Sequence, residues 1–208
     1  MSKALAAWFM ITTATAAPVA TPRDTVQSAT TRVVAVLQEA QLNKPDAGEG
    51  RGRGMAQPVG AEIRRVAADV FDFDEMARRT LSQHWAKRSP AERSELAGFI
   101  ADLLERSYLG RVTAYAGEKI VYTSETTDGD YATVRSKVVA EGRPDTAVAY
   151  QLLRKDGRWK VYDVLVDGVS FVSTYRGEFN RVIQSASYGA LIERLKKSRA
   201  AGLVATGR

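Results

Sequence analysis

Few side chains in this sequence are suited to chemistry, and they do not gather in one motif. Its 208 residues include one histidine, His84, and no cysteine. Nucleophilic hydrolysis needs a base, usually a histidine, beside a serine or cysteine, and a zinc site needs several histidine or cysteine ligands. The sequence also lacks a glycine–serine elbow and a glycine-rich nucleotide loop. We therefore expect no catalytic residue, no metal site and no cofactor, and we expect His84 on or near a helix surface.

Asp163 is the one carboxylate that suggests an enzyme. It lies within an otherwise apolar strand pattern, where burial would favour the protonated form and make it a candidate general base. The order of elements described below is compatible with the cone-shaped fold of nuclear-transport-factor-like proteins, which also hosts ketosteroid-isomerase chemistry. In the alternative, structural interpretation, Asp163 accepts hydrogen bonds from neighbouring backbone groups or pairs with Arg176 and ties a helix to the sheet.

Composition and charge argue against several other classes of protein. Apolar residues make up 45% of the chain and charged residues 26%, as in an ordinary globular protein, and the length suits a single domain. The formal charge is +6, but acids and bases are interleaved in segments such as 62–65 and 92–95, which is typical of solvated helix faces. We therefore expect no nucleic-acid partner, with a basic-glycine RNA-binding segment at Arg51–Gly54 as the alternative. The surface suits transient contact with anionic lipid headgroups or an acidic protein.

Residues 1–20 have the three-part pattern of a secretory signal peptide. A basic start is followed by an apolar run from Ala4 to Ile11, and small residues then allow cleavage after Ala16 or Ala20. The apolar run is well short of the ~20 residues that a membrane span needs. Without cysteine, the mature protein has neither a disulfide nor a lipoprotein attachment site. We expect it to be free in an exported compartment.

Helical periodicity dominates the first half of the chain after this segment. An amphipathic helix is followed by a glycine-rich stretch at residues 43–60, which predicts a flexible loop. A second helical stretch comes next. Two further helices begin at capping sequences, one with Asp72 and Glu75 and one with Ser89 and Glu92.

The apolar period then changes from about 3.6 to 2, which indicates strands. Four alternating segments with short glycine turns predict an antiparallel meander at 119–125, 131–140, 146–154 and 158–166. Helical periodicity returns from Ser170 to about Arg199, and residues 200–208 are predicted as a disordered tail. The expected fold class is α+β, with a curved four-stranded antiparallel sheet covered by N- and C-terminal helices in one domain at 21–199.

A strand, a glycine turn and a helix start follow one another from Trp159 to Phe179. Other motifs occur along the chain in the order Phe71-Asp72, Met76-Ala77-Arg78, Leu81, Trp85, Pro90 to Arg93, Phe99, Tyr108, Val148-Ala149-Tyr150, Asp156-Gly157-Arg158-Trp159, Tyr162-Asp163-Val164, Asp167-Gly168-Val169-Ser170, Tyr175-Arg176, Phe179 and Leu191-Ile192. In kind and order, this series resembles the toluene-tolerance family, the periplasmic phospholipid carriers of the maintenance-of-lipid-asymmetry (Mla) pathway. The resemblance points to carrying and not to chemistry.

The resemblance implies an apolar pocket for acyl chains, a periplasmic location and two partners. These partners are the substrate-binding subunit of an inner-membrane ABC transporter and an outer-membrane lipoprotein complex. The implied pocket lining is Phe99, Leu103, Val134, Val148, Tyr150, Leu152, Val164, Val169, Phe179 and Ile183, residues that periodicity alone would assign to a core. Gly168 would permit the tight turn, and Asp163 with Arg176 would brace it. The segment Tyr115–Lys119 resembles hopanoid-associated members, so a hopanoid is the alternative cargo.

Overall fold

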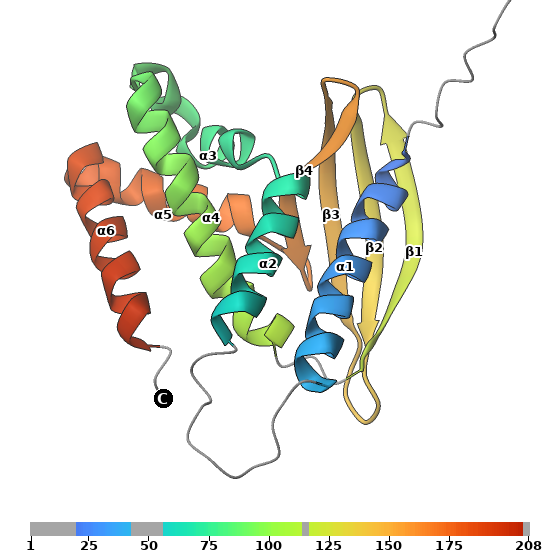
Figure 1. The fold of residues 1–208 in the computed structure, drawn as a ribbon. Helices are drawn as coiled ribbons and strands as arrows, with labels where there is room; N and C mark the ends of the chain where they lie inside the picture. The colour runs from blue at the N-terminus through green and yellow to red at the C-terminus, as the bar shows by residue number, and fades with distance from the viewer. Residues whose placement is uncertain (1–19, 43–55, 114–116, 206–208) are drawn as a thin grey trace, which may run out of the picture.

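The computed structural model describes residues 20–42, 56–113 and 117–205 (Figure 1). Most of the predicted signal peptide and of the predicted loop lies outside these residues. The helices are α1 (Pro22–Leu42), α2 (Ala56–Val70), α3 (Phe73–Leu81), the 3-10 helix η1 (Ser82–Lys87), α4 (Pro90–Thr113), α5 (Phe171–Ser185) and α6 (Tyr188–Ala205). The strands are β1 (Lys119–Asp128), β2 (Tyr131–Val139), β3 (Thr146–Lys155), β4 (Arg158–Val166) and β5 (Val169–Ser170). Within the described ranges, no helix has the length and apolar character that a membrane crossing requires.

The strands form one antiparallel sheet in the order β1-β2-β3-β4-β5. The α+β class and the meander are confirmed, but the described residues contain five strands and not the expected four. Asp167 and Gly168, with φ of 49° and 81°, reverse the chain so tightly that Val169 and Ser170 pair back onto β4. A strand of two residues is too short to show an alternating pattern in the sequence, which explains why it was not expected.

The predicted capping sequences of α3 and α4 are confirmed. Asp72 Oδ1 accepts a hydrogen bond from the Glu75 N–H at 2.9 Å. Ser89 Oγ accepts from the Glu92 N–H at 3.3 Å, and Glu92 Oε2 accepts from the Ser89 N–H at 2.8 Å, which completes a reciprocal capping box. These helix starts could be predicted from the sequence because the first-turn N–H groups lack partners within the helix and bond to side chains only three residues away.

Two predicted boundaries are wrong. Helix α2 begins at Ala56, so residues 56–60 are helical although they were expected in the loop. Proline is tolerated there because first-turn N–H groups have no partner within a helix. Helix α6 continues to Ala205, so most of the expected tail is helical, in keeping with the high helix propensity of alanine and leucine in that segment.

The helices form two groups around the sheet. Helices α1 and α2 pack on each other and against the sheet, whereas α3 to α6 form a separate helical layer on the β4 side (Figure 1). The segment between α2 and α3 joins the groups, because Phe71 forms an isolated parallel bridge with Val161 of β4. The Asp72 N–H also donates to the Val161 carbonyl at 2.9 Å. The apolar interior is therefore divided between these two groups.

Candidate functional site

The buried apolar side chains form two clusters. The helical cluster lies among α3 to α6, and its buried members are Met76, Ala77, Leu81, Leu96, Ala97, Phe99, Ile100, Leu103, Leu104, Phe171, Val172, Phe179, Val182, Leu191, Ile192 and Leu195. The sheet cluster lies between α1, α2 and the strands, and its buried members are Val26, Ala29, Val66, Val70, Ala132, Val134, Leu152, Trp159, Val161 and Val164. Among the described residues, only Phe71 packs against both clusters. We call the boundary at Phe71 the seam.

Nine of the ten residues expected to line a pocket fall into these clusters. The helical cluster contains or contacts Phe99, Leu103, Phe179 and Ile183. The sheet cluster contains or contacts Val134, Val148, Tyr150, Leu152 and Val164. The two sets therefore occupy different parts of the interior, one in the helical layer and one against the sheet.

The tenth residue, Val169, lies elsewhere. It is 63% exposed on the short strand β5, so its side chain belongs to neither cluster. The tight turn at Gly168 and the pairing of β5 at the end of the sheet place it in solvent. Its assignment to the lining came from its position after an apolar strand, and the extra turn changes the direction of the chain at that point.

Asp163 joins the sheet to α5. Its Oδ1 accepts a hydrogen bond from the buried Val172 N–H at 3.0 Å, and its Oδ2 accepts from Ser170 Oγ at 2.5 Å. Ser170 Oγ in turn accepts from the Ser173 N–H at 2.9 Å and caps α5. Both carboxylate oxygens are thus engaged at a helix N-terminus, where negative charge is favourable.

The expected pairing of Asp163 with Arg176 is not what the structure shows. Within the described residues, Asp163 is bonded to Ser170 and Val172, and Arg176 is exposed and forms no ion pair. Arg176 comes more than one turn after the start of α5 and points to solvent, whereas the backbone N–H groups of the first turn lie next to the strand. The single histidine, His84 on η1, shares a hydrogen bond with Asn180, farther along α5, at 3.0 Å.

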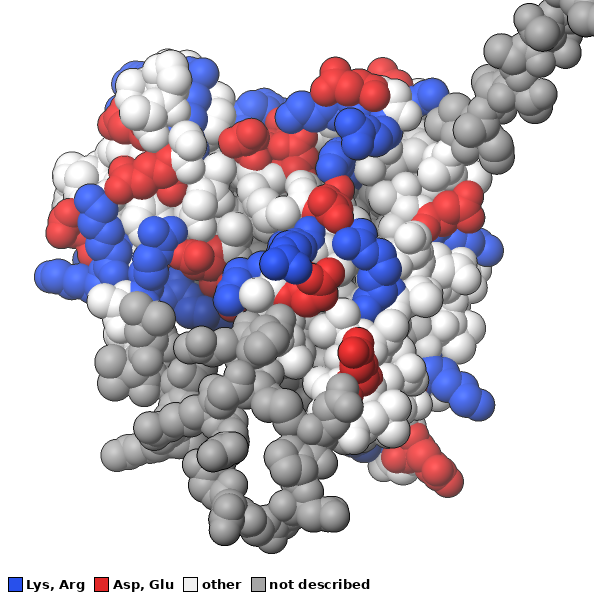
Figure 2. All heavy atoms as spheres, in the orientation of Figure 1, with Lys and Arg blue, Asp and Glu red and all other residues white. Residues whose placement is uncertain are grey.

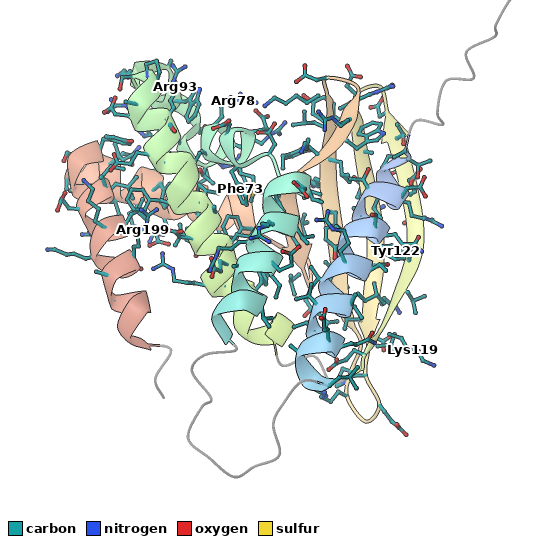
Figure 3. All side chains as sticks on the ribbon, viewed as in Figure 1. Phe73, Arg78, Arg93, Lys119, Tyr122 and Arg199 are labelled. Carbon is teal, nitrogen blue, oxygen red and sulfur yellow. The ribbon has the colours of Figure 1, made fainter. Side chains whose placement is uncertain are left out.

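The sheet cluster contains hydroxyl groups as well as apolar side chains. Thr30 Oγ1 of α1 and the Tyr122 hydroxyl of β1 are 2.5 Å apart, and Figure 3 labels Tyr122 beside α1. Burial raises the pKa of Tyr122, an effect that the bond with Thr30 partly offsets. Burial, with a smaller contribution from Tyr122, also raises the pKa of Tyr150 well above its ordinary value of 10.0. Both phenols therefore stay neutral near pH 7.

The surface of the described residues has hollows that lie away from the predicted lining residues, and two of them are well defined. The first, which we call the junction hollow, has a volume of about 350 Å³ and is lined by Ala68, Phe71, Asp72, Phe73, Asp74, Lys155, Asp156, Arg158 and Lys160. The second has a volume of about 340 Å³ and is lined by Thr174, Gly177, Glu178, Arg181, Val182, Ser185 and Arg194. The enclosed apolar pocket implied by the resemblance therefore stays a prediction.

This fold and these motifs match known proteins along most of the chain. The family model described as MlaC protein matches residues 27–197. The chain belongs to the MlaC family. The resemblance to the toluene-tolerance family is thereby confirmed, and a second relative bears that name: toluene tolerance protein ttg2D of Pseudomonas putida is 24% identical over 170 residues, covering 79% of this chain and 74% of the relative.

Two further comparisons are with proteins named for phospholipids. The intermembrane phospholipid transport system binding protein MlaC of Haemophilus influenzae is 22% identical over 141 residues, covering 65% of this chain and 66% of the relative, just under two thirds of its length. The solved structure of the phospholipid-binding protein from Ralstonia solanacearum, in complex with a phospholipid, superposes with a TM-score of 0.72. It is 22% identical, and the match covers 86% of this chain and 97% of that one. This superposition establishes the shared fold.

The sequence analysis singled out Phe71 but did not predict that it would contact both apolar clusters. Phe71 was part of the family motif Phe71-Asp72, where it preceded a helix cap. Its contact with both clusters depends on the backbone bridge to Val161, some ninety residues later in the chain. No local pattern could have shown that contact.

Proposed function

We propose that this protein is a periplasmic phospholipid-binding carrier of an Mla-type transport system. Its membership of the MlaC family carries the proposal. The name of the Haemophilus relative and the lipid-bound Ralstonia structure give the class of ligand. The divided apolar interior supports it, because a carrier needs apolar walls that can part and close again.

The free energy of hiding an acyl chain sets what a carrier must provide. Burial of one methylene is worth roughly 0.8 kcal/mol, so a chain of about sixteen carbons would lose on the order of 12 kcal/mol if it were left bare in water. Nearly the whole chain must therefore be covered by protein. In this proposal the acyl chains enter at the seam, with the helical cluster as one wall and the sheet cluster as the other.

The named residues then divide between the walls. Phe99, Leu103, Phe179 and Ile183 would contact lipid from the helical side, and Val134, Val148, Tyr150, Leu152 and Val164 from the sheet side. The hydroxyls of Tyr122 and Tyr150 are compatible with this role because both phenols remain uncharged. Gly168 and Asp163 would act structurally, by holding the β4–β5 turn against the start of α5.

The partners follow from the same proposal. A carrier that exchanges lipid between membranes would meet the substrate-binding subunit of an inner-membrane ABC transporter and an outer-membrane lipoprotein complex. The predicted signal peptide at residues 1–20 supports export to the periplasm. The relative named as part of an intermembrane phospholipid transport system supports the same route.

Lipid analysis of the purified protein tests this function directly. The protein is isolated without detergent, its lipids are extracted, and their number and kind are determined by mass spectrometry. We expect stoichiometric phospholipid, and uptake of labelled phospholipid from vesicles after delipidation. A hopanoid in place of phospholipid would support the alternative cargo, whereas absence of any bound lipid together with no uptake would overturn the proposal.

A further inference from the structure

The junction hollow lies beside the seam between the two apolar clusters. Phe71, which packs against both, lines it. Phe71 stacks on Phe73 with ring centroids 5.8 Å apart and an angle of 14° between the planes, so an aromatic pair lines the hollow. Phe73 begins α3 and is labelled in Figure 3. A volume of about 350 Å³ is within the range of small-molecule sites, which runs from roughly 300 to 1,000 Å³.

The charges around this hollow are balanced in number and mixed in position. Three basic residues and three aspartates line it. Figure 2 shows acidic and basic side chains side by side along the upper part of the molecule, near α3 and the ends of the strands. An anion would meet three carboxylates here, and a cation would meet three basic groups. A ligand that carries both charges suits the hollow better than either.

Two of the basic groups are already engaged by the protein. Lys155 Nζ forms an ion pair with Asp72 Oδ2 at 2.7 Å, and Lys160 Nζ donates to the Asp69 carbonyl. The bond to Asp72 is the largest cause of a raised pKa at Lys155, with smaller contributions from the charges of Asp74 and Asp156. Those two aspartates therefore interact electrostatically with the Lys155 ammonium group but form no hydrogen bond with it.

Three charged side chains remain available. Among the described residues, Arg158, Asp74 and Asp156 form no ion pair and no side-chain hydrogen bond, yet all three line the hollow. A guanidinium binds a phosphate with directed N–H donors, and carboxylates accept from an ammonium group. The hollow thus offers one group for phosphate and two for an ammonium ion, next to aromatic rings that also attract cations.

We propose that the junction hollow binds the zwitterionic headgroup of a phospholipid, with its phosphate at Arg158 and its ammonium group at Asp74 and Asp156. This inference rests on the proposed carrier function, because the acyl chains of the same lipid would pass Phe71 into the seam. The geometry then makes the protein selective: a zwitterionic lipid is preferred over an anionic lipid with the same tails.

A competition experiment tests this selectivity. Delipidated protein is incubated with vesicles that contain equal amounts of phosphatidylethanolamine and phosphatidylglycerol with identical acyl chains, and the lipid it takes up is quantified by mass spectrometry. We expect the zwitterionic lipid to be favoured. The double variant Asp74→Asn/Asp156→Asn removes both unpaired carboxylates, and the ratio should shift about fivefold toward the anionic lipid. Arg158→Ala should reduce uptake of both lipids, because each carries the phosphate that this guanidinium would bind.

The matched control is Glu39→Gln/Glu141→Gln, with one residue on α1 and the other in the β2–β3 turn. It changes the net charge by the same amount at two exposed residues that do not line the hollow. Selectivity that changes in the double variant of the hollow and not in this control supports the site. The headgroup site is overturned if the wild type takes up lipid without preference, or if both double variants shift the ratio equally. If no variant and no wild-type protein takes up lipid, the carrier function itself fails.

Discussion

The helical cluster and the sheet cluster are both apolar, but their side chains are held in different ways. In the helical cluster, Phe171, Tyr175 and Phe179 form an aromatic series with centroid distances of 4.6 and 5.7 Å. Arginines cover its edges: Arg199 lies 4.2 Å from the centre of the Phe99 ring, and Arg88 lies 4.3 Å from that of Tyr188. Aromatic pairs and arginine–ring contacts have preferred orientations, so they fix the positions of these side chains in addition to burying apolar surface.

The sheet cluster has a different cover. Its members are mostly small or β-branched, and α1 is attached near the sheet edge by polar contacts such as Thr30 with Tyr122 and the Arg23 N–H with Glu125 at 2.7 Å. An exposed ion pair between Arg32 and Asp69 links α1 to α2, and such pairs are worth little. We infer that the helical cluster provides rigidity, and that in the proposed carrier the cover of the sheet cluster would yield to let lipid enter.

The largest expected effect is the loss of an aromatic side chain from the helical cluster. Phe179→Ala removes a ring that is 1% exposed, and we expect it to lower the free energy of unfolding by about 3–5 kcal/mol through lost burial and a residual cavity. Urea denaturation measures this loss. The exposed Val169→Ala serves as the control and should change stability by less than about 0.5 kcal/mol. Similar values for both variants would contradict the rigid role of the helical cluster.

A larger side chain in the sheet cluster should reduce lipid uptake more than it reduces the stability of the fold. Val134 is fully buried on β2, and Val134→Trp would fill space along the sheet-side wall at a cost of about 1–3 kcal/mol in stability. We expect lipid uptake from vesicles to weaken about tenfold, which corresponds to ~1.4 kcal/mol. Val121→Trp on β1 makes the same substitution at a side chain that is 46% exposed and should leave uptake unchanged. Normal uptake by a folded Val134→Trp protein would exclude the sheet cluster as a lipid wall.

The link between the two regions can be weakened at Asp163. Asp163→Ala leaves the Val172 N–H and the Ser170 hydroxyl without their acceptor, and we expect a loss of about 1–3 kcal/mol in the free energy of unfolding. Thermal or urea unfolding of this variant is compared with that of Asp128→Ala, which alters an exposed turn residue. A variant as stable as the wild type would show that this joint between β4 and α5 does not hold the regions together.

The smallest effect is expected at the ion pair beside the seam. Lys155→Gln removes the partner of Asp72, but the lysine side chain is 49% exposed, so the loss should be about 1 kcal/mol or less. The pairing raises the pKa of Lys155 above its ordinary value of 10.5. Its stabilising effect is therefore present below pH 10.5 and is lost as the pH rises through the raised pKa. The free energies of unfolding of the wild type and of Lys155→Gln are compared at neutral pH and at a pH above the raised pKa. We expect the difference between them to disappear at the higher pH, and a difference that grows with pH would contradict this role.

Local features of the fold were predictable from local residues. The helix starts at Asp72 and Ser89 could be read because each cap bonds to a residue three positions later. The four long strands could be read from their alternation. The strand β5, the early start of α2 and the extension of α6 could not, because two residues carry no period and helix ends depend on small differences in propensity.

The site was only partly predictable for a related reason. Periodicity marked Phe99 and Val134 as buried, but it could not show that they belong to different clusters. It also could not show that Val169 turns outward after Gly168. For Asp163 it left two alternatives open, and only the structure shows the backbone at the start of α5 as its partner and not Arg176. Each of these outcomes depends on where the chain returns after a turn.

The amino-acid sequence by itself determined the family, the α+β class and the apolar faces of the helices and strands, because these depend on residue type and on spacing within one element. Only the tertiary structure decided that the apolar faces form two clusters with Phe71 between them. It also decided that oppositely charged groups from α3 and the β3–β4 hairpin surround one hollow. Contacts between residues about ninety positions apart have no local signature, since they arise only when the β4 strand is brought beside the link between α2 and α3.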